Sequence, residues 1–120
     1  MSRPTLYGIK NCDSVRKARK FLDAHNIAYD FYDLRADGIS QQLLKSWCSE
    51  VNWELLLNRR STTFKQLDPA TKLDIDEACA INLMHSQPTL IKRPVLQWQG
   101  AQKQLMVGFN SEHYEHLINA

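Results

Sequence analysis

The 120-residue sequence predicts an α/β fold with a mixed four-stranded sheet and an inserted helical lobe. An apolar strand, an amphipathic helix and a second strand follow one another at the start of the chain. Residues 40–86 then keep helical periodicity, and two further strands and a last helix follow Pro88. This length suits a single domain, with its core in residues 1–39 and 87–120 and a helical insertion at about 40–86.

The first three elements form a predicted β-α-β unit. Residues 5–9 are typical of a short buried strand, and residues 13–25 of a helix with one apolar face. Asn26 is expected to end that helix, because asparagine tolerates the left-handed conformation of a helix C-terminus. Residues 28–34, rich in aromatics, form the second strand. A strand-helix-strand unit of this length predicts that the two strands are parallel.

The helical insertion begins after a predicted turn at residues 35–38, with Ser40 as the cap of its first helix. Further on, Asp68 is expected to cap a helix that has Pro69 at its first position. Residues 74–85 become mostly apolar toward their end, which predicts a buried helix.

The last third of the chain predicts a hairpin and a final helix. Residues 95–98 form a strand, residues 99–101 a turn, and residues 103–107 a strand that returns antiparallel. An amphipathic helix bearing Tyr114 closes the sequence.

Composition narrows the functional classes. A formal net charge of +2 is too small to favour nucleic acid as a partner, and no apolar run is long enough to span a membrane. The N-terminal residues lack the apolar core of a signal peptide, so we expect a cytoplasmic protein. No cysteine or histidine spacing indicates a metal site, and no Cys-x-x-Cys pair occurs. Two of the three cysteines, Cys48 and Cys79, are expected to pack inside helices as small apolar residues.

Cys12 is the candidate nucleophile. It stands where the first strand gives way to the first helix, so unpaired N–H groups and the positive end of the helix dipole favour its thiolate. Arg16, one helical turn further on, could add a positive charge, while Asp13 opposes it. The alternative is that Cys12 is only a small buried residue at a helix start.

Five segments in order along the chain resemble the ArsC-like arsenate reductase family, and particularly its Spx/YffB branch. They are residues 7–18 (YGIKNCDSVRKA), 32–38 (YDLRADG), 56–62 (LLNRRST), 90–96 (LIKRPVL) and 107–109 (VGF). The resemblance implies a thioredoxin/glutaredoxin-like core, βαβ–ββα, with a helical insertion. That core agrees with the order of elements predicted above.

The resemblance also assigns roles to residues. Cys12 matches the nucleophilic cysteine, and Arg60 resembles the oxyanion-binding arginine of the helical insertion, with Arg59 as the alternative. Arg93 matches the arginine before a cis-proline, which here would be Pro94. Arg16, Asn11 and Lys10 are further candidates for the mouth of the same anion site.

Two departures bear on the expected chemistry. The region of the third arginine of arsenate-reducing members reads LMVGF (105–109), without a basic residue, and residues 8–11 read GIKN rather than the His-Asn-Pro type. The resemblance implies a glutathione-dependent thiol oxidoreductase with Cys12 as its single nucleophile, and the two departures indicate that its arsenate activity is weak. Glutathione would be its co-substrate and glutaredoxin a recycling partner, with no bound cofactor or metal. The alternative is an Spx-like module that binds RNA polymerase without turnover.

Overall fold

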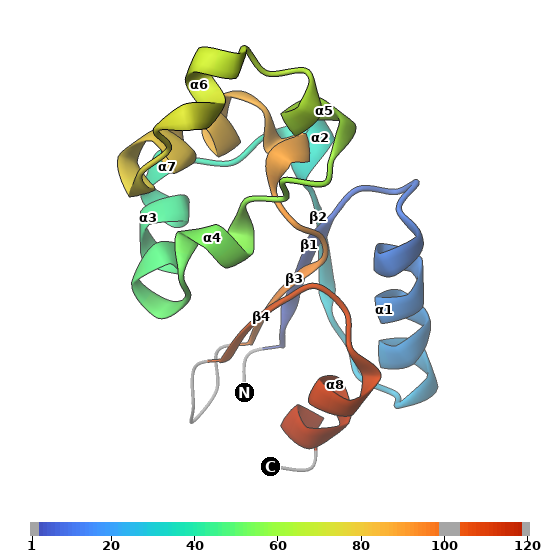
Figure 1. Ribbon diagram of the computed structural model, residues 1–120. Helices are drawn as coiled ribbons and strands as arrows, with labels where there is room; N and C mark the ends of the chain where they lie inside the picture. Colours follow the sequence, from blue (N-terminus) through green and yellow to red (C-terminus); the bar gives the residue numbers. More distant parts are fainter. Residues whose placement is uncertain (1–2, 99–103, 119–120) are drawn as a thin grey trace. The chain divides into compact units, whose positions relative to one another are not determined.

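The computed structural model describes residues 3–98 and 104–118, so the predicted turn at residues 99–101 lies outside the described part. The chain forms two compact units (Figure 1). The sheet unit consists of residues 1–33 and 93–120, and the helical unit of residues 34–92. Within the described ranges, no helix is long and apolar enough to cross a membrane.

The sheet unit contains the mixed four-stranded sheet that the sequence predicts. Its strand order is β2-β1-β3-β4. Strand β1 (Thr5–Gly8) pairs parallel with β2 (Asp30–Asp33), as expected for a β-α-β unit. Strand β3 (Val95–Trp98) runs antiparallel to β1, and β4 (Gln104–Val107) antiparallel to β3.

One face of this sheet carries the core of the unit. Helices α1 (Asp13–Ala24) and α8 (Ser111–Ile118) both pack on it (Figure 1). Since side chains alternate along a strand, the strand residues that point toward these helices are apolar. The buried cluster comprises Leu6, Val15, Ala18, Leu22, Leu96 and Tyr114. The packing of α1 on β1 places the beginning of the helix at the end of the strand.

The junction after β2 differs from the prediction. The strand is shorter than residues 28–34, and Leu34 begins a short helix, α2 (Leu34–Asp37), where a turn was expected at residues 35–38. The side chain of Leu34 is fully buried, so tertiary packing outweighs the local turn preference of the sequence. Gly38 follows with φ +67°, a conformation that glycine adopts readily.

The helical unit consists of short helices. They are α2, described above, α3 (Gln41–Glu50), α4 (Trp53–Leu56), α5 (Thr62–Lys65), α6 (Pro69–Leu73), α7 (Glu77–Ser86) and the 3₁₀ turn Pro88–Leu90. The predicted cap Ser40 is confirmed, because its Oγ accepts a hydrogen bond of 3.1 Å from Leu43 N. Pro69 begins α6 as predicted, but among the described contacts the Asp68 side chain makes no capping bond.

The helical unit has buried apolar side chains of its own. Its largest fully buried side chains are Trp47, Leu34, Leu44, Leu56, Met84, Leu90 and Ile91. A β-bridge between Leu57 and Ile91 joins the segment after α4 to the segment after the 3₁₀ turn. Lys92 N donates to Leu56 O at 2.7 Å beside that bridge. These bonds hold the last residues of the unit against its middle.

Candidate active site around Cys12

Cys12 is the N-cap residue of α1. Its backbone is extended, with φ −111° and ψ 126°, and its carbonyl accepts the first helical hydrogen bond, from Arg16 N at 3.0 Å. Within the described residues its side chain makes no capping bond. The thiol therefore lies beside the free N–H groups of the first turn, which is the position expected from the sequence. Cys12 is half-buried and packs against the buried cluster.

Gly8 allows α1 to begin so close to the sheet. A Cβ at this position would lie 2.7 Å from Val15 Cγ2, closer than side-chain atoms normally approach. Val15 is fully buried in the first turn of α1, so it cannot move without displacing the helix start. No role was expected for Gly8 from the sequence. Its place between an apolar strand and an amphipathic helix is the signal that could have indicated one.

Pro94 stands near the same end of β1. Val95 pairs with Tyr7, and the strands are antiparallel, so the chain enters β3 where it leaves β1 toward Cys12. The Arg93–Pro94 peptide bond is cis, the geometry expected of this proline. Pro94 O accepts a bond of 2.7 Å from Gly108 N, which anchors the entrance of β3. Arg93 itself is half-buried, and its Nε is shielded from solvent.

Charged side chains surround the beginning of α1. Arg16 Nη2 donates to Asp13 Oδ1, and this bond together with the charge of Arg16 holds the pKa of Asp13 below its usual range. The negative charge of Asp13 would disfavour a thiolate at Cys12, and the positive charge of Arg16 reduces that effect. Lys10 and Asn11 are exposed in the turn before Cys12. The i, i+3 spacing of Asp13 and Arg16 could have predicted their pairing.

The helical unit contains the other two predicted arginines, and their surroundings differ. Both are exposed, but the Arg59 guanidinium lies over the Trp53 ring, 6.0 Å from its centroid. Arg60 N donates to Asn58 Oδ1 at 3.1 Å, which shapes the turn before α5. In the described part of the chain, the Arg60 side chain makes no hydrogen bond, ion pair or ring contact. Its guanidinium is therefore available to an anion.

The remaining cysteines occupy different settings. Cys48 lies in the last turn of α3, where burial raises the pKa of its thiol and the charge of Glu77 raises it further. Cys79 lies in a helix, as expected, but in the first turn of α7 rather than in its middle. Its backbone N donates to Asp76 Oδ1 at 2.8 Å, so a carboxylate caps that helix. The prediction placed the start of this helix too early. No group of metal-binding side chains occurs among the described residues.

Comparison with known proteins identifies the family. The model described as the ArsC family matches residues 7–117. The chain belongs to this family. A solved structure of the YffB protein is 50% identical, with a TM-score of 0.88, and the match covers 94% of this chain and 96% of that one. The arsenate reductase (ArsC) related protein of Brucella melitensis is 42% identical, with a TM-score of 0.75 and coverage of 99% and 97%.

A relative of another kind is the global transcriptional regulator Spx of Streptococcus mutans. It is 31% identical over 119 residues, which are 95% of this chain and 82% of the relative. The resemblance stated from the sequence is therefore confirmed at the level of the family. The predicted fold class, a thioredoxin/glutaredoxin-like core with an inserted helical lobe, is confirmed as well.

Proposed function

We propose that this ArsC-family protein is a thiol oxidoreductase that uses Cys12 as its single nucleophile and glutathione as its co-substrate. The observation that carries the proposal is the position of Cys12 at the N-cap of α1, where the helix end favours a thiolate. The same sheet unit holds the cis Arg93–Pro94 bond near the end of β1. Similarity to the arsenate reductase (ArsC) related protein supports a reductase.

The reaction would take place in two thiol–disulfide exchanges. The Cys12 thiolate attacks the glutathione sulfur of a mixed disulfide R–S–S–G, forms Cys12–S–S–G, and releases R–S⁻, which takes a proton from solvent. A second glutathione thiolate then attacks the glutathione sulfur, forms glutathione disulfide, and restores the Cys12 thiolate. In total, one mixed disulfide is reduced and two glutathione units are joined. Because Cys12 has no Cys-x-x-Cys partner, we assign the resolving step to an external thiol. In the cell, glutaredoxin could take the place of the second glutathione.

Arginines are suited to the anionic parts of such a substrate, because a guanidinium donates two parallel hydrogen bonds to a carboxylate or oxyanion. Arg93 and Arg60 are our candidates, and Lys10, Asn11 and Arg16 are secondary ones. We include Arg60 for two reasons. It lies in the family motif at residues 56–62, and its guanidinium has no partner among the described residues. Since residues 105–109 supply no third arginine, arsenate should bind less tightly than a peptide-like substrate. Losing one charge-assisted contact costs about tenfold or more in affinity.

Two assays on one preparation test the proposal. Native protein is incubated with glutathione disulfide, and mass spectrometry then maps the adduct. We expect an adduct of one glutathione at Cys12, with little at Cys48 or Cys79. Turnover of a glutathione mixed disulfide is then compared with arsenate reduction, each with glutathione as reductant. Efficient arsenate turnover without mixed-disulfide activity would overturn the proposed substrate preference.

The second candidate function is a regulatory module that binds RNA polymerase without turnover, in the cytoplasm. Similarity to the Spx regulator of Streptococcus mutans favours it. Co-purification with RNA polymerase, unchanged when Cys12 is replaced by serine, is the expected result for such a module. An enzyme would lose its activity with the same substitution, so one variant separates the two functions.

A further inference from the structure

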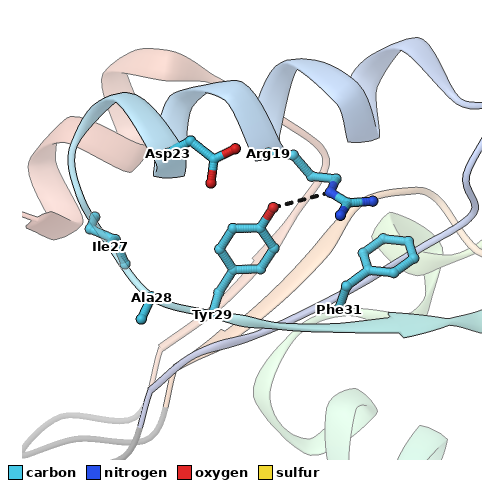
Figure 2. Close-up of a pocket in the computed structure, with 6 residues that line it drawn as sticks. All are labelled: Arg19, Asp23, Ile27, Ala28, Tyr29 and Phe31. Carbon is cyan, nitrogen blue, oxygen red and sulfur yellow. Dashed lines mark hydrogen bonds between the residues drawn. The ribbon is translucent and has the colours of Figure 1, made fainter.

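A polar cleft lies in the sheet unit, between α1 and the chain that enters β2. Its volume is about 390 Å³, within the range of small-molecule sites. The residues that line it are Arg19, Asp23, Ile27, Ala28, Tyr29 and Phe31 (Figure 2). None of these residues belongs to the candidate active site around Cys12.

Arg19 is held in place from two sides. Its Nε donates to Tyr29 Oη at 3.0 Å, and its guanidinium carbon lies 4.4 Å from the centroid of the Phe31 ring. These contacts engage Nε and one face of the guanidinium. They leave the two terminal amino groups free among the described residues. A guanidinium fixed in this way is prepared to bind a carboxylate with both amino groups, because little side-chain entropy remains to be lost.

Asp23 supplies the opposite charge one helical turn away. Figure 2 shows that Arg19 and Asp23 both extend from α1 on the side where Tyr29 lies. Residues at i and i+4 on a helix often form an ion pair, but within the described ranges these two do not. The cation is engaged by the two aromatic side chains instead. The cleft therefore presents an unpaired cation and an unpaired carboxylate beside an aromatic ring.

We propose that this cleft binds the head group of an α-amino acid, in which a carboxylate and an ammonium share one carbon. The carboxylate binds the terminal amino groups of Arg19, and the ammonium binds the carboxylate of Asp23. Ile27, Tyr29 and Phe31 supply apolar surface for the remainder of the ligand. A free amino acid carries this head group, and so does the γ-glutamyl end of glutathione. None of the residues that line the cleft takes part in the exchange steps proposed at Cys12.

The test is a titration of the full ¹⁵N-labelled chain followed by NMR. The probes are L-alanine with both charges, propionate with the carboxylate only, ethylamine with the ammonium only, and S-methylglutathione, whose thiol is blocked. We expect saturable shifts at the amides of Arg19, Asp23 and Tyr29 with L-alanine, S-methylglutathione or both. Which of these two saturates identifies the source of the head group. Propionate and ethylamine should each bind about tenfold more weakly than the zwitterion that saturates, because each lacks one of the two charged groups.

Substitutions separate binding from folding. Asp23 is exposed, so Asp23→Asn keeps the shape of the cleft and should reduce binding of the zwitterion about tenfold. Arg19→Gln should abolish it. Lys20→Gln on the same helix and Asp74→Asn, both exposed, are matched controls and should bind as the parent does. The proposal is overturned if neither zwitterion saturates, if propionate binds as tightly as the zwitterion that saturates, or if Asp23→Asn has no effect.

Discussion

Two helices of this protein begin beside a cysteine, and their surroundings differ in charge. Cys12 is the N-cap of α1, and Cys79 is the third residue of α7. Both lie near free N–H groups and the positive end of a helix dipole. At α7, however, Asp76 caps the helix and Glu77 is its first residue. Two carboxylates therefore lie at the positive end of this helix dipole. At α1 the single carboxylate, Asp13, is bound by Arg16.

The comparison teaches that a helix start by itself does not make a reactive thiol. The helix favours a negative charge, and the nearby side chains decide which group carries that charge. At α7 the capping carboxylate of Asp76 carries it, whereas at α1 the N-cap side chain makes no capping bond among the described residues. Cys48, in the last turn of α3, is the opposite case, because burial and Glu77 both raise the pKa of its thiol.

The largest expected effect comes from removing each thiol in turn. Cys12→Ser should reduce mixed-disulfide turnover to the uncatalysed background, because serine cannot form the exchange intermediate. Cys79→Ser and Cys48→Ser should keep most of the activity. Steady-state turnover measured on the three variants at equal concentration checks this. Loss of activity in Cys79→Ser with retention in Cys12→Ser would reverse our comparison of the two helix starts.

The next effect concerns the arginines of the helical unit. Arg60→Ala should raise KM for the glutathione mixed disulfide about tenfold, because one charge-assisted contact is lost. Arg59→Ala is the matched control and should change KM much less, since that guanidinium lies over Trp53. A larger effect of Arg59→Ala would show that Arg59, and not Arg60, corresponds to the oxyanion-binding arginine of the family.

A smaller effect should follow from changing the carboxylate at each helix start. Asp13→Asn should increase the rate at which iodoacetamide labels Cys12 by roughly threefold, because a negative charge beside the thiolate disappears. Asp76→Asn should act in the same way on Cys79 and leave Cys12 unchanged. Peptide mapping after timed labelling at neutral pH measures both rates. The differences should shrink in 1 M salt, where exposed charges are screened. Equal labelling of Cys12 before and after Asp13→Asn would contradict the electrostatic explanation.

The smallest effect concerns the core that supports α1. Tyr114 is 1% exposed, and its hydroxyl has no hydrogen-bond partner among the described residues. Its ring packs against Phe21 and Phe109, with centroids 5.6 and 4.9 Å away. Tyr114→Phe keeps this packing and removes an unsatisfied buried group. The free energy of unfolding should therefore rise by up to about 1 kcal/mol.

Tyr7 offers the matched control for that substitution. Its hydroxyl donates to Gln97 Oε1 at 3.3 Å, so Tyr7→Phe removes a hydrogen bond that is made. We expect Tyr7→Phe to lower the free energy of unfolding by about 0.5–1.5 kcal/mol. Urea titrations of the two variants and the parent compare them directly. Destabilisation by Tyr114→Phe would mean that the hydroxyl is satisfied in solution.

The sequence by itself determined the order of elements, the start of α1 after Cys12, the cap at Ser40 and the start of α6 at Pro69. These features depend on local rules, namely the spacing of apolar residues and the preferences of serine, proline and asparagine at helix ends. The left-handed Asn26, with φ 57°, belongs to the same group. The family motifs added Arg93 and Pro94, whose peptide bond is cis.

Only the tertiary structure decided which distant residues meet. The strand order β2-β1-β3-β4 and the close approach of Val15 to Gly8 are products of packing, as is the burial of Leu34 that turned a predicted loop into α2. The cleft at Arg19 has the same origin, because it needs Phe31 of β2 beneath a side chain of α1. Local sequence cannot specify such contacts, since their free energy arises only when separate segments exclude water together.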